Sequence, residues 1–248
     1  MSSLLRFRLW KLIVTLIILS AAICAAVYVK PYSPDAVAAA SMNTTPDVIV
    51  SEQKDWISFV PAHPSSPSIL FYPGRLVKPE SYAPLAAELA QSGHPTYIIK
   101  MPFDLAILGI DEALKVIDAH PEEQFVIGGH ALGGVMAARF ASKHRELVEG
   151  VFFLAAYPDA QADLVGTGLP VLSLLGTKDG KVDPLAYKRA SRYLPAPLTR
   201  YKEIAGGNHA QFGSYGKQDG DGRAAISAEE QRRKTVEAMT SWIEAAVE

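Results

Sequence analysis

An aspartate and a histidine follow two late apolar stretches of the chain. Asp179 comes soon after residues 171–175, and His209 follows residues 199–204 by way of two glycines. If both stretches are strands of one parallel sheet, both side chains lie at the carboxyl end of that sheet, where such sheets place their sites. A histidine there can take the proton of a nucleophile, while an aspartate orients the ring and stabilises its charged form. The pair therefore predicts nucleophilic catalysis, although each residue taken singly also fits a turn aspartate or a surface histidine.

The candidate position for the nucleophile lies in a glycine-rich turn earlier in the chain. Apolar residues 125–127 lead into Gly129-x-Ala131-x-Gly133, and a helical pattern of small residues follows. This is the strand, turn and helix context of a Gly-x-Ser-x-Gly turn, in which the glycines allow close approach around a strained central residue. Ala131 occupies the place of the serine, and a methyl group cannot attack a carbonyl. The turn therefore predicts a fold more directly than it predicts an activity.

With this turn and with the Gly-Gly-Asn-His run of residues 206–209, the chain resembles the α/β-hydrolase superfamily. The resemblance covers residues 47–247 and is strongest to a bacterial branch of small serine hydrolases. It implies an α/β-hydrolase fold, in which a mainly parallel sheet carries helices on both faces. It also implies the catalytic order nucleophile, acid, base, which assigns Ala131 to the nucleophile position, Asp179 to the acid and His209 to the base. The implied substrate is a small ester or a similar acyl compound, with no cofactor.

An oxyanion hole in this fold requires two backbone N–H groups, one after the nucleophile and one from an early loop. By position the first belongs to Leu132, and the resemblance points to Arg75 for the second. The same resemblance places Gly74, His130 and Phe212 at the substrate. The alternatives are an ordinary turn at the glycine and arginine, and a packed or hydrogen-bonded histidine at position 130.

The alanine at position 131 has three competing explanations. The chain is a Ser→Ala variant of an active hydrolase, or the natural protein has lost its nucleophile and binds a ligand or partner, or His209 activates water directly. Retention of Asp179, His209 and the glycine turn indicates a lineage that performed hydrolysis. A non-catalytic binding protein therefore stands as the alternative to a serine hydrolase of the esterase type. Ser214 is a further hydroxyl close to His209 in the sequence, but nothing in the expected fold activates it.

Apolar, strand-like stretches alternate with helical patterns through the rest of the chain. Residues 48–50 and 56–60 predict an antiparallel hairpin at the edge of the sheet. Alternation of the remaining elements is typical of a mainly parallel sheet that is covered on both faces. The other expected strands cover residues 68–72, 96–99, 125–127, 151–154, 171–175 and 199–204, and the expected helices include one with apolar residues at 110, 113, 114 and 117 and a final one over 236–247.

The N-terminal residues have the composition of a targeting segment. Residues 12–29 are almost entirely apolar and follow Arg6, Arg8 and Lys11. The length of this stretch is near the lower limit for a membrane-spanning helix, and the basic residues before it favour a cytoplasmic N-terminus. We therefore expect a single-pass transmembrane signal anchor over residues 1–30, with the rest of the chain on the extracytoplasmic side of the cell membrane. Secretion after signal cleavage is one alternative, and a buried helix of the domain is another.

The remainder of the chain is expected to form a linker and one domain. Residues 31–46 contain several prolines and serines, which is typical of a linker, so the hydrolase domain is expected over residues 47–248. Past the basic N-terminal segment the acidic residues outnumber the basic ones, which argues against nucleic acid as a partner. Cys24 is the only cysteine, so the domain forms no disulfide. The Asp-Gly-Asp-Gly run at 219–222 resembles the start of a calcium loop but lacks the later ligands, so no metal site is expected.

Overall fold

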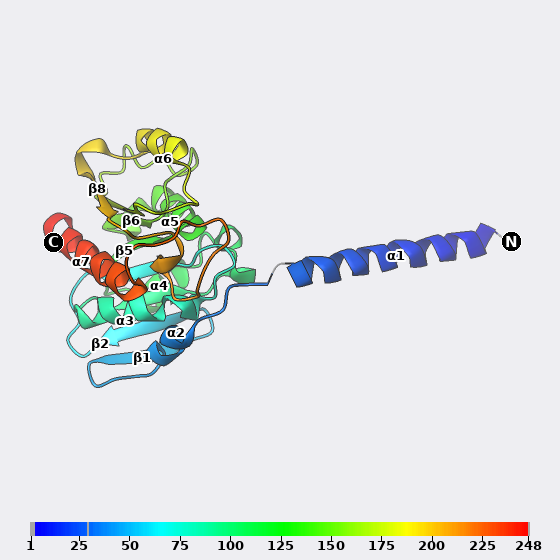
Figure 1. Ribbon diagram of the computed structural model, residues 1–248, viewed down its shortest axis with the longest axis horizontal. Helices are drawn as coiled ribbons and strands as arrows, with labels where there is room; N and C mark the ends of the chain where they lie inside the picture. Colours follow the sequence, from blue (N-terminus) through cyan, green and yellow to red (C-terminus); the bar gives the residue numbers. More distant parts are fainter. Residues whose placement is uncertain (1–2, 29, 248) are drawn as a thin grey trace. The chain divides into compact units, whose positions relative to one another are not determined.

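The computed structural model describes residues 3–28 and 30–247, and it describes side chains for residues 6–20 and 30–247. The chain divides into two compact units, Met1–Tyr32 and Ser33–Glu248 (Figure 1). The first unit contains the helix α1, Ser3–Tyr28. The second contains all the strands of the described chain, so the candidate site has to be sought there.

The helix α1 corrects the predicted membrane anchor. Among the described residues, no helix is both long enough and apolar enough to cross a membrane. A spanning helix needs about 20 mostly apolar residues, whereas the part of α1 with described side chains, residues 6–20, includes Arg6, Arg8 and Lys11. The prediction of an N-terminal transmembrane helix is therefore wrong, and the membrane partner that it implied loses its support. The later part of the predicted span, residues 21–29, lies outside the described side chains.

The second unit is built on one eight-stranded sheet with the order β1-β2-β4-β3-β5-β6-β7-β8. The hairpin of β1 and β2 is antiparallel and lies at the edge, as predicted, and β2 also pairs antiparallel with β4. The other neighbouring strands pair in parallel, which confirms the mainly parallel sheet. The strands are β1 Val48–Glu52, β2 Trp56–Pro61, β3 Ser68–Tyr72, β4 Thr96–Ile99, β5 Phe125–His130, β6 Gly150–Leu154, β7 Val171–Gly176 and β8 Thr199–Ile204.

Helices cover both faces of this sheet, again as predicted. The α-helices of the unit are α2 Ala36–Ser41, α3 Ala83–Gln91, α4 Leu114–Ala119, α5 Leu132–Lys143, α6 Pro184–Ala190 and α7 Ala228–Ala246. The short 3-10 helices are η1 Pro79–Tyr82, η2 Pro102–Asp104, η3 Ala106–Leu108, η4 Arg145–Leu147, η5 Ser191–Tyr193, η6 Ala196–Leu198 and η7 Ala210–Phe212. Several connections between strands and α-helices therefore contain a 3-10 turn.

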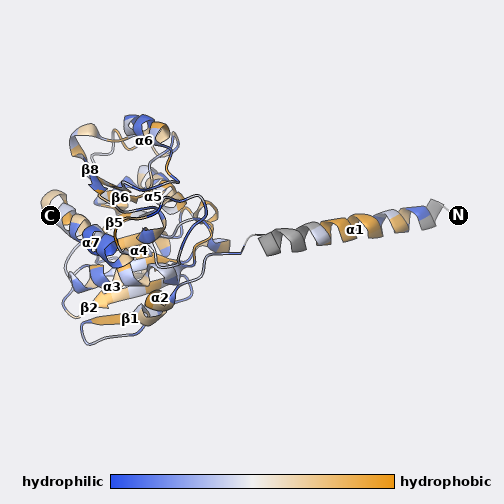
Figure 2. Cartoon of the chain, in the orientation of Figure 1, coloured by the Kyte–Doolittle hydropathy of each residue, from blue (hydrophilic) through white to orange (hydrophobic). Residues whose placement is uncertain are grey.

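Side-chain alternation along the strands divides the core between the two faces. α3 and α7 contact each other on one face, where Trp242 of α7 lies against Gly150 of β6 (Figure 1). α7 carries hydrophilic residues as well as hydrophobic ones, which agrees with one buried side (Figure 2). On the other face, Met136 and Phe140 of α5 join a buried cluster with Phe153 of β6. Both faces of the central strands β3, β5 and β6 are thus removed from water. The helix α5 begins directly after β5 and its glycine turn.

One predicted helix is shorter than its apolar pattern indicates. The helical spacing begins at Ile110, but α4 begins only at Leu114. The buried hydroxyl of Tyr72 donates to the carbonyl of Ile110 at 2.6 Å and accepts the N–H of Ala113 at 3.2 Å. These two bonds hold residues 110–113 in turns, because a long-range side chain takes the backbone groups that a helix would pair internally.

Candidate active site

The turn between β5 and α5 holds Ala131 in an uncommon backbone conformation. Its φ is 48° and its ψ is −120°, a positive φ that non-glycine residues rarely adopt. Such a conformation costs about 1–3 kcal/mol and persists only where surrounding contacts enforce it. Here the N–H of Ala131 donates to the carbonyl of Leu154 at the end of β6, at 3.0 Å. Position 131 is therefore held at the carboxyl edge of the sheet, between a strand end and a helix start.

The two glycines of the turn are required by close backbone contacts. A Cβ atom on Gly129 would lie 2.2 Å from the carbonyl oxygen of Tyr72 in β3, and a Cβ atom on Gly133 would lie 2.1 Å from the same oxygen. Both distances are far inside van der Waals contact, and the atom met is backbone that cannot rotate away. The glycines therefore allow β5 and α5 to pack directly on β3, which is the role that the sequence pattern predicts for them.

Asp179 and His209 are joined by a hydrogen bond although 30 residues separate them in the chain. Asp179 lies in the turn after β7 and His209 lies in the turn after β8. The Nδ1 of His209 and the Oδ2 of Asp179 are 2.9 Å apart, and the two side chains are only 6% and 2% exposed. The other carboxylate oxygen, Oδ1, accepts the N–H groups of Lys181 and Val182 at 2.7 and 2.9 Å. The structure thus brings the predicted acid and base together and fixes the carboxylate from two sides.

These contacts decide the charge of the aspartate and the tautomer of the histidine. Burial by itself would raise the pKa of Asp179, but the hydrogen bond and charge of His209 and the two backbone donors outweigh it and lower this pKa. An ionised carboxylate can only accept, so the Nδ1 of His209 must carry the hydrogen. In the neutral ring, Nε2 then carries a lone pair and no hydrogen. That nitrogen is suited to take a proton from a neighbouring group.

His130, the residue before Ala131, links the turn to His209. It is 1% exposed, and its ring centre lies 4.5 Å from the ring centre of His209. Its Nδ1 is 2.9 Å from the hydroxyl of Tyr82, and Phe212 packs against its ring. Burial and then the nearby charge of His209 hold the pKa of His130 well below its usual value, so the ring is neutral. The predicted substrate contacts of His130 and Phe212 stay predictions, since the structure places both side chains in the packed wall beside the base.

The two predicted oxyanion donors lie at the ends of different turns. Leu132 is the first residue of α5, where N–H groups have no partner within the helix, and the methyl of Ala131 provides no capping bond. Arg75 follows β3 and is exposed. Its N–H donates to no backbone carbonyl among the described residues. Both groups therefore keep a free donor at the carboxyl edge of the sheet, and their role in an oxyanion hole stays a prediction.

Sequence reasoning misses Tyr82, which connects the early loop to the glycine turn. Its hydroxyl accepts the N–H of Gly74 at 3.0 Å and pairs with the Nδ1 of His130. A Cβ atom on Gly74 would lie 2.9 Å from both of these side-chain atoms, so glycine is needed there as well. In the sequence, Tyr82, Leu85, Ala86 and Leu89 have the spacing of one apolar helix face, and that pattern gives no sign of a polar role for the tyrosine. The buried hydroxyl fixes the loop that carries Arg75.

Ser214, the other hydroxyl considered from the sequence, is held through its backbone. Its N–H donates to the carbonyl of Ser81 at 2.7 Å, and its carbonyl accepts the N–H of Asp35 at 2.9 Å. Among the described residues, no hydrogen bond joins its hydroxyl to His209. The structure therefore gives Ser214 no base that would activate it.

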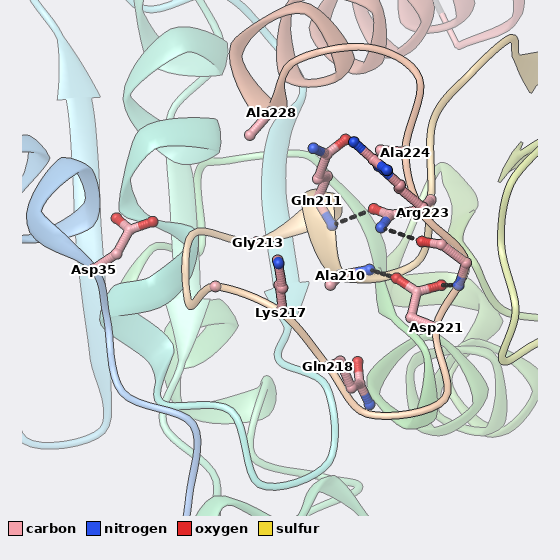
Figure 3. Close-up of a pocket in the computed structure, with 13 residues that line it drawn as sticks. Asp35, Ala210, Gln211, Gly213, Lys217, Gln218, Asp221, Arg223, Ala224 and Ala228 are labelled. Carbon is pink, nitrogen blue, oxygen red and sulfur yellow. Dashed lines mark hydrogen bonds between the residues drawn. The ribbon is translucent and has the colours of Figure 1, made fainter.

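A cavity of about 730 Å³ lies beside the segment that follows His209 (Figure 3). Its charged and amide side chains include Asp35, Gln211, Lys217 and Arg223. Ala131, Asp179 and His209 are not among its lining residues, so it lies beside the candidate site and not at the proposed reacting groups.

One group of side chains in the described chain has the spacing of a metal site. Ligand atoms of His120, Glu122 and Glu123 lie within 4.8 Å of one another. Both carboxylate oxygens of Glu123 already accept hydroxyl donors, from Tyr97 and from Ser68. The group also precedes β5, at the amino end of the strand whose carboxyl end carries the glycine turn. These contacts account for the carboxylate of Glu123 without an ion, and the group lies away from the candidate site.

Comparisons with known proteins agree with this geometry. The sequence model of the alpha/beta hydrolase family matches residues 68–233, which is more than half of the chain. No curated protein sequence matches. The matched range runs from the start of β3 into α7, and it includes the glycine turn and both residues of the bonded pair.

Solved structures with similar folds include several hydrolases. A predicted CIB-like hydrolase from Thermoplasma acidophilum is 16% identical, covering 78% of this chain and 99% of its own, with a TM-score of 0.58. A bacterial heroin esterase is 15% identical, covering 83% of this chain and 88% of its own, with a TM-score of 0.61. An esterase from Mycobacterium tuberculosis is 12% identical, covering 85% and 97%, with a TM-score of 0.59. Identities this low show a shared fold alone.

Proposed function

Because the chain belongs to the alpha/beta hydrolase family, we propose that its site is that of a serine-type esterase in which Ala131 holds the place of the nucleophile. The observation that carries the proposal is the buried hydrogen bond between Asp179 and His209, next to a turn that holds position 131 in a strained conformation. Esterases among the structural neighbours agree with this class of reaction. The substrate is a small carboxylic ester or a related acyl compound.

The proposed chemistry follows from the tautomer of His209. With serine at position 131, its oxygen attacks the ester carbonyl carbon while its proton passes to the Nε2 of His209. Asp179 stabilises the charged ring, and the N–H groups of Leu132 and Arg75 receive the oxyanion. The leaving alcohol takes the proton from His209, and water then repeats the sequence to release the acid. With alanine at position 131 the covalent step has no attacking atom, so this chain binds the ester without forming an acyl-enzyme.

Exposed apolar side chains beside the early loop suggest where the acyl group lies. Phe103 is 83% exposed, and Ile107 and Leu108 are 50% and 58% exposed. Their segment is tied to the early loop because the N–H of Leu76 donates to the carbonyl of Asp104 at 2.8 Å. It also packs on α5 through η3. We place the apolar part of the substrate on this segment, which adjoins both proposed oxyanion donors.

A second candidate function rests on Ala131 itself. A chain without the nucleophile can serve as a ligand-binding protein that keeps the hydrolase fold. His209 acting directly on water is a further route, because Nε2 has the lone pair that a general base needs. These readings differ from the esterase proposal in what a restored serine does to the rate.

The test compares the chain with its Ala131→Ser variant in the hydrolysis of p-nitrophenyl acetate. We expect a gain of at least roughly 100-fold, because removal of a triad nucleophile costs far more than that. Ala155→Ser is the matched control, since Ala155 also has a φ of 48° at the end of a strand but lies outside the turn. The control should leave the rate at the level of the parent chain.

The outcomes separate the candidate functions. A gain confined to Ala131→Ser supports the esterase proposal. Equal rates in all three proteins, together with calorimetric binding of a non-hydrolysed ester, support the ligand-binding protein. A rate above background in the parent chain that disappears in His209→Ala, without a gain from serine, supports direct activation of water.

A further inference from the structure

The carboxylate of Asp221 accepts backbone N–H groups from three segments of the chain. Its Oδ1 accepts from Gly180 at 3.0 Å, from His209 at 3.3 Å and from Gly222 at 2.7 Å. Its Oδ2 accepts from Ala210 at 2.9 Å. Figure 3 shows the side chain turned toward Ala210, with a dashed line on their hydrogen bond. All these donors are uncharged, so backbone dipoles alone surround this carboxylate among its hydrogen-bond partners.

The segments joined in this way are those that carry the proposed acid and base. Gly180 directly follows Asp179, and the N–H groups of His209 and Ala210 begin the turn that holds the imidazole. A single carboxylate thus connects the turn after β7 to the turn after β8. Its Oδ2 accepts only from the turn after β8, whereas its Oδ1 accepts from both turns.

Further contacts hold residues 219–222 between the two turns. The side chain of Lys181 donates to the carbonyl of Asp219 at 3.0 Å, and the amide of Asn208 donates to the carbonyl of Gly222 at 2.8 Å. A Cβ atom on Gly222 would lie 1.9 Å from the carbonyl oxygen of Lys178. Residues 219–222 therefore form a clamp between the two turns, and the half-buried carboxylate of Asp221 accepts four of its hydrogen bonds.

We propose that Asp221 is a positioning residue that holds Asp179 and His209 at hydrogen-bonding distance. It acts through the backbone of their turns and does not contact the substrate, and its importance for the rate rests on the proposed function. The two turns also meet directly, since the N–H of Lys178 donates to the carbonyl of Gly207 at 2.8 Å and the N–H of Gly206 donates to the hydroxyl of Thr177 at 2.9 Å. Asp221 adds the link that lies nearest the two side chains, because it binds the N–H of Gly180, directly after Asp179, and the N–H of His209 itself. Asparagine cannot replace it, because one carboxylate oxygen becomes an NH₂ group that faces N–H donors.

The first test uses the chain with Ala131 and needs no activity. The proton between the Nδ1 of His209 and Asp179 gives a far-downfield proton NMR signal when the ring is held against the carboxylate. We expect Asp221→Asn to broaden this signal beyond detection. Asp219→Asn is the matched control, since it removes the same charge from the same segment and its exposed side chain makes no hydrogen bond among the described residues. The control should keep the signal.

The second test uses Ala131→Ser as the background. Asp221→Asn should lower kcat by about 10- to 100-fold with KM within about twofold, because displacement of a catalytic group by about 1 Å costs on this scale. Asp221→Glu keeps both acceptor oxygens and should recover part of kcat. Asp219→Asn should leave both constants unchanged.

Backbone hydrogen exchange of the unsubstituted chain keeps the proposal testable if Asp221→Asn fails to fold. The N–H groups of Gly180 and Ala210 belong to different turns, and both should exchange slowly, because Asp221 holds them. Exchange of both at the rate of an open loop would overturn the proposal.

The results distinguish this inference from the proposed function. If the Ala131→Ser protein is inactive but its NMR signal still depends on Asp221, the positioning role is supported and the esterase proposal is refuted. If the Ala131→Ser protein is active and Asp221→Asn changes neither kcat nor the signal, the positioning role is refuted and the esterase proposal is supported. A loss shared equally by Asp219→Asn also overturns it, because the effect would then come from charge and not from the clamp.

Discussion

Replacing Asp179 by asparagine should invert the hydrogen bonding of His209 while keeping the shape of the turn. The Oδ1 of Asp179 accepts two backbone N–H groups, from Lys181 and Val182. In the Asp179→Asn variant the carboxamide oxygen has to keep these two donors, since an NH₂ group there would face both of them. The NH₂ group is then turned toward the Nδ1 of His209, now 2.9 Å from the carboxylate.

The magnitude follows from the tautomer that this exchange imposes. A Nδ1 that faces an NH₂ group must accept, so the ring hydrogen moves to Nε2 and the general base is lost. The same change in a serine-protease triad lowers kcat about 10⁴-fold. At about 1.4 kcal/mol for each tenfold, the barrier rises by about 5 kcal/mol. The lost charge-assisted bond should also lower the free energy of unfolding by about 1.5–3 kcal/mol.

The kinetic assay places Asp179→Asn in the Ala131→Ser background and follows p-nitrophenyl acetate hydrolysis. Urea unfolding of Asp179→Asn in the chain with Ala131 gives the stability without interference from turnover. Asp118→Asn is the control for both measurements, because Asp118 is exposed on α4 and makes no hydrogen bond or ion pair among the described residues. It should match its parent in rate and in midpoint.

A kcat within tenfold of the Ala131→Ser parent would refute the reasoning about the tautomer. It would mean that His209 reaches the reactive form without Asp179 or takes no part in the reaction. A normal unfolding midpoint together with a lost rate would keep the tautomer argument and remove only the stability estimate.

Three further outcomes are expected. The pKa of Asp179 is lowered in the folded chain, so its ionised form stabilises the fold above the unfolded pKa. This stabilisation is lost as the pH falls through the lower folded pKa. The difference in unfolding free energy between pH 6 and pH 3 should therefore be smaller in Asp179→Asn than in the parent chain. Gly133→Ala should destabilise by about 3 kcal/mol despite the better helix propensity of alanine, because its Cβ meets backbone, whereas Gly166→Ala, with nothing within 4 Å, should stay near neutral in urea titrations. In the Ala131→Ser background, Phe103→Ala should lower kcat/KM for octanoate esters by about tenfold and leave acetate unchanged, since apolar contact with the longer acyl chain gives about 1–3 kcal/mol of discrimination; an equal loss on both esters would place the acyl group elsewhere.

The sheet and the glycine turn follow from local features of the sequence. Period-two and continuous apolar runs place the strands, and a parallel sheet then puts residues 131, 179 and 209 at one edge. Gly129 and Gly133 are predictable because only a residue without Cβ fits where two backbones meet. The absence of a hydroxyl at position 131 is a property of the sequence alone. It limits the chemistry whatever the fold.

The N-terminal anchor shows where composition misleads. The apolar run of residues 12–29 predicts a span, but length and apolarity have to be continuous along one helix to cross a bilayer. In the described part of α1, residues 6–20, three basic side chains precede the apolar residues, and no described helix is long and apolar enough to cross a membrane. A local pattern also misleads at Ile110, because the hydroxyl of the distant Tyr72 binds the backbone groups of residues 110 and 113.

The sequence by itself determined the order of strands and helices along the chain, the steric need for glycine around position 131, and the chain positions of the proposed acid and base. Only the tertiary structure decided that Tyr82 pairs with His130 and that Asp221 joins the turns of Asp179 and His209. The reason is physical. Strand periodicity and glycine sterics act between neighbours in the chain, whereas these hydrogen bonds join residues far apart whose meeting depends on how every intervening turn is folded.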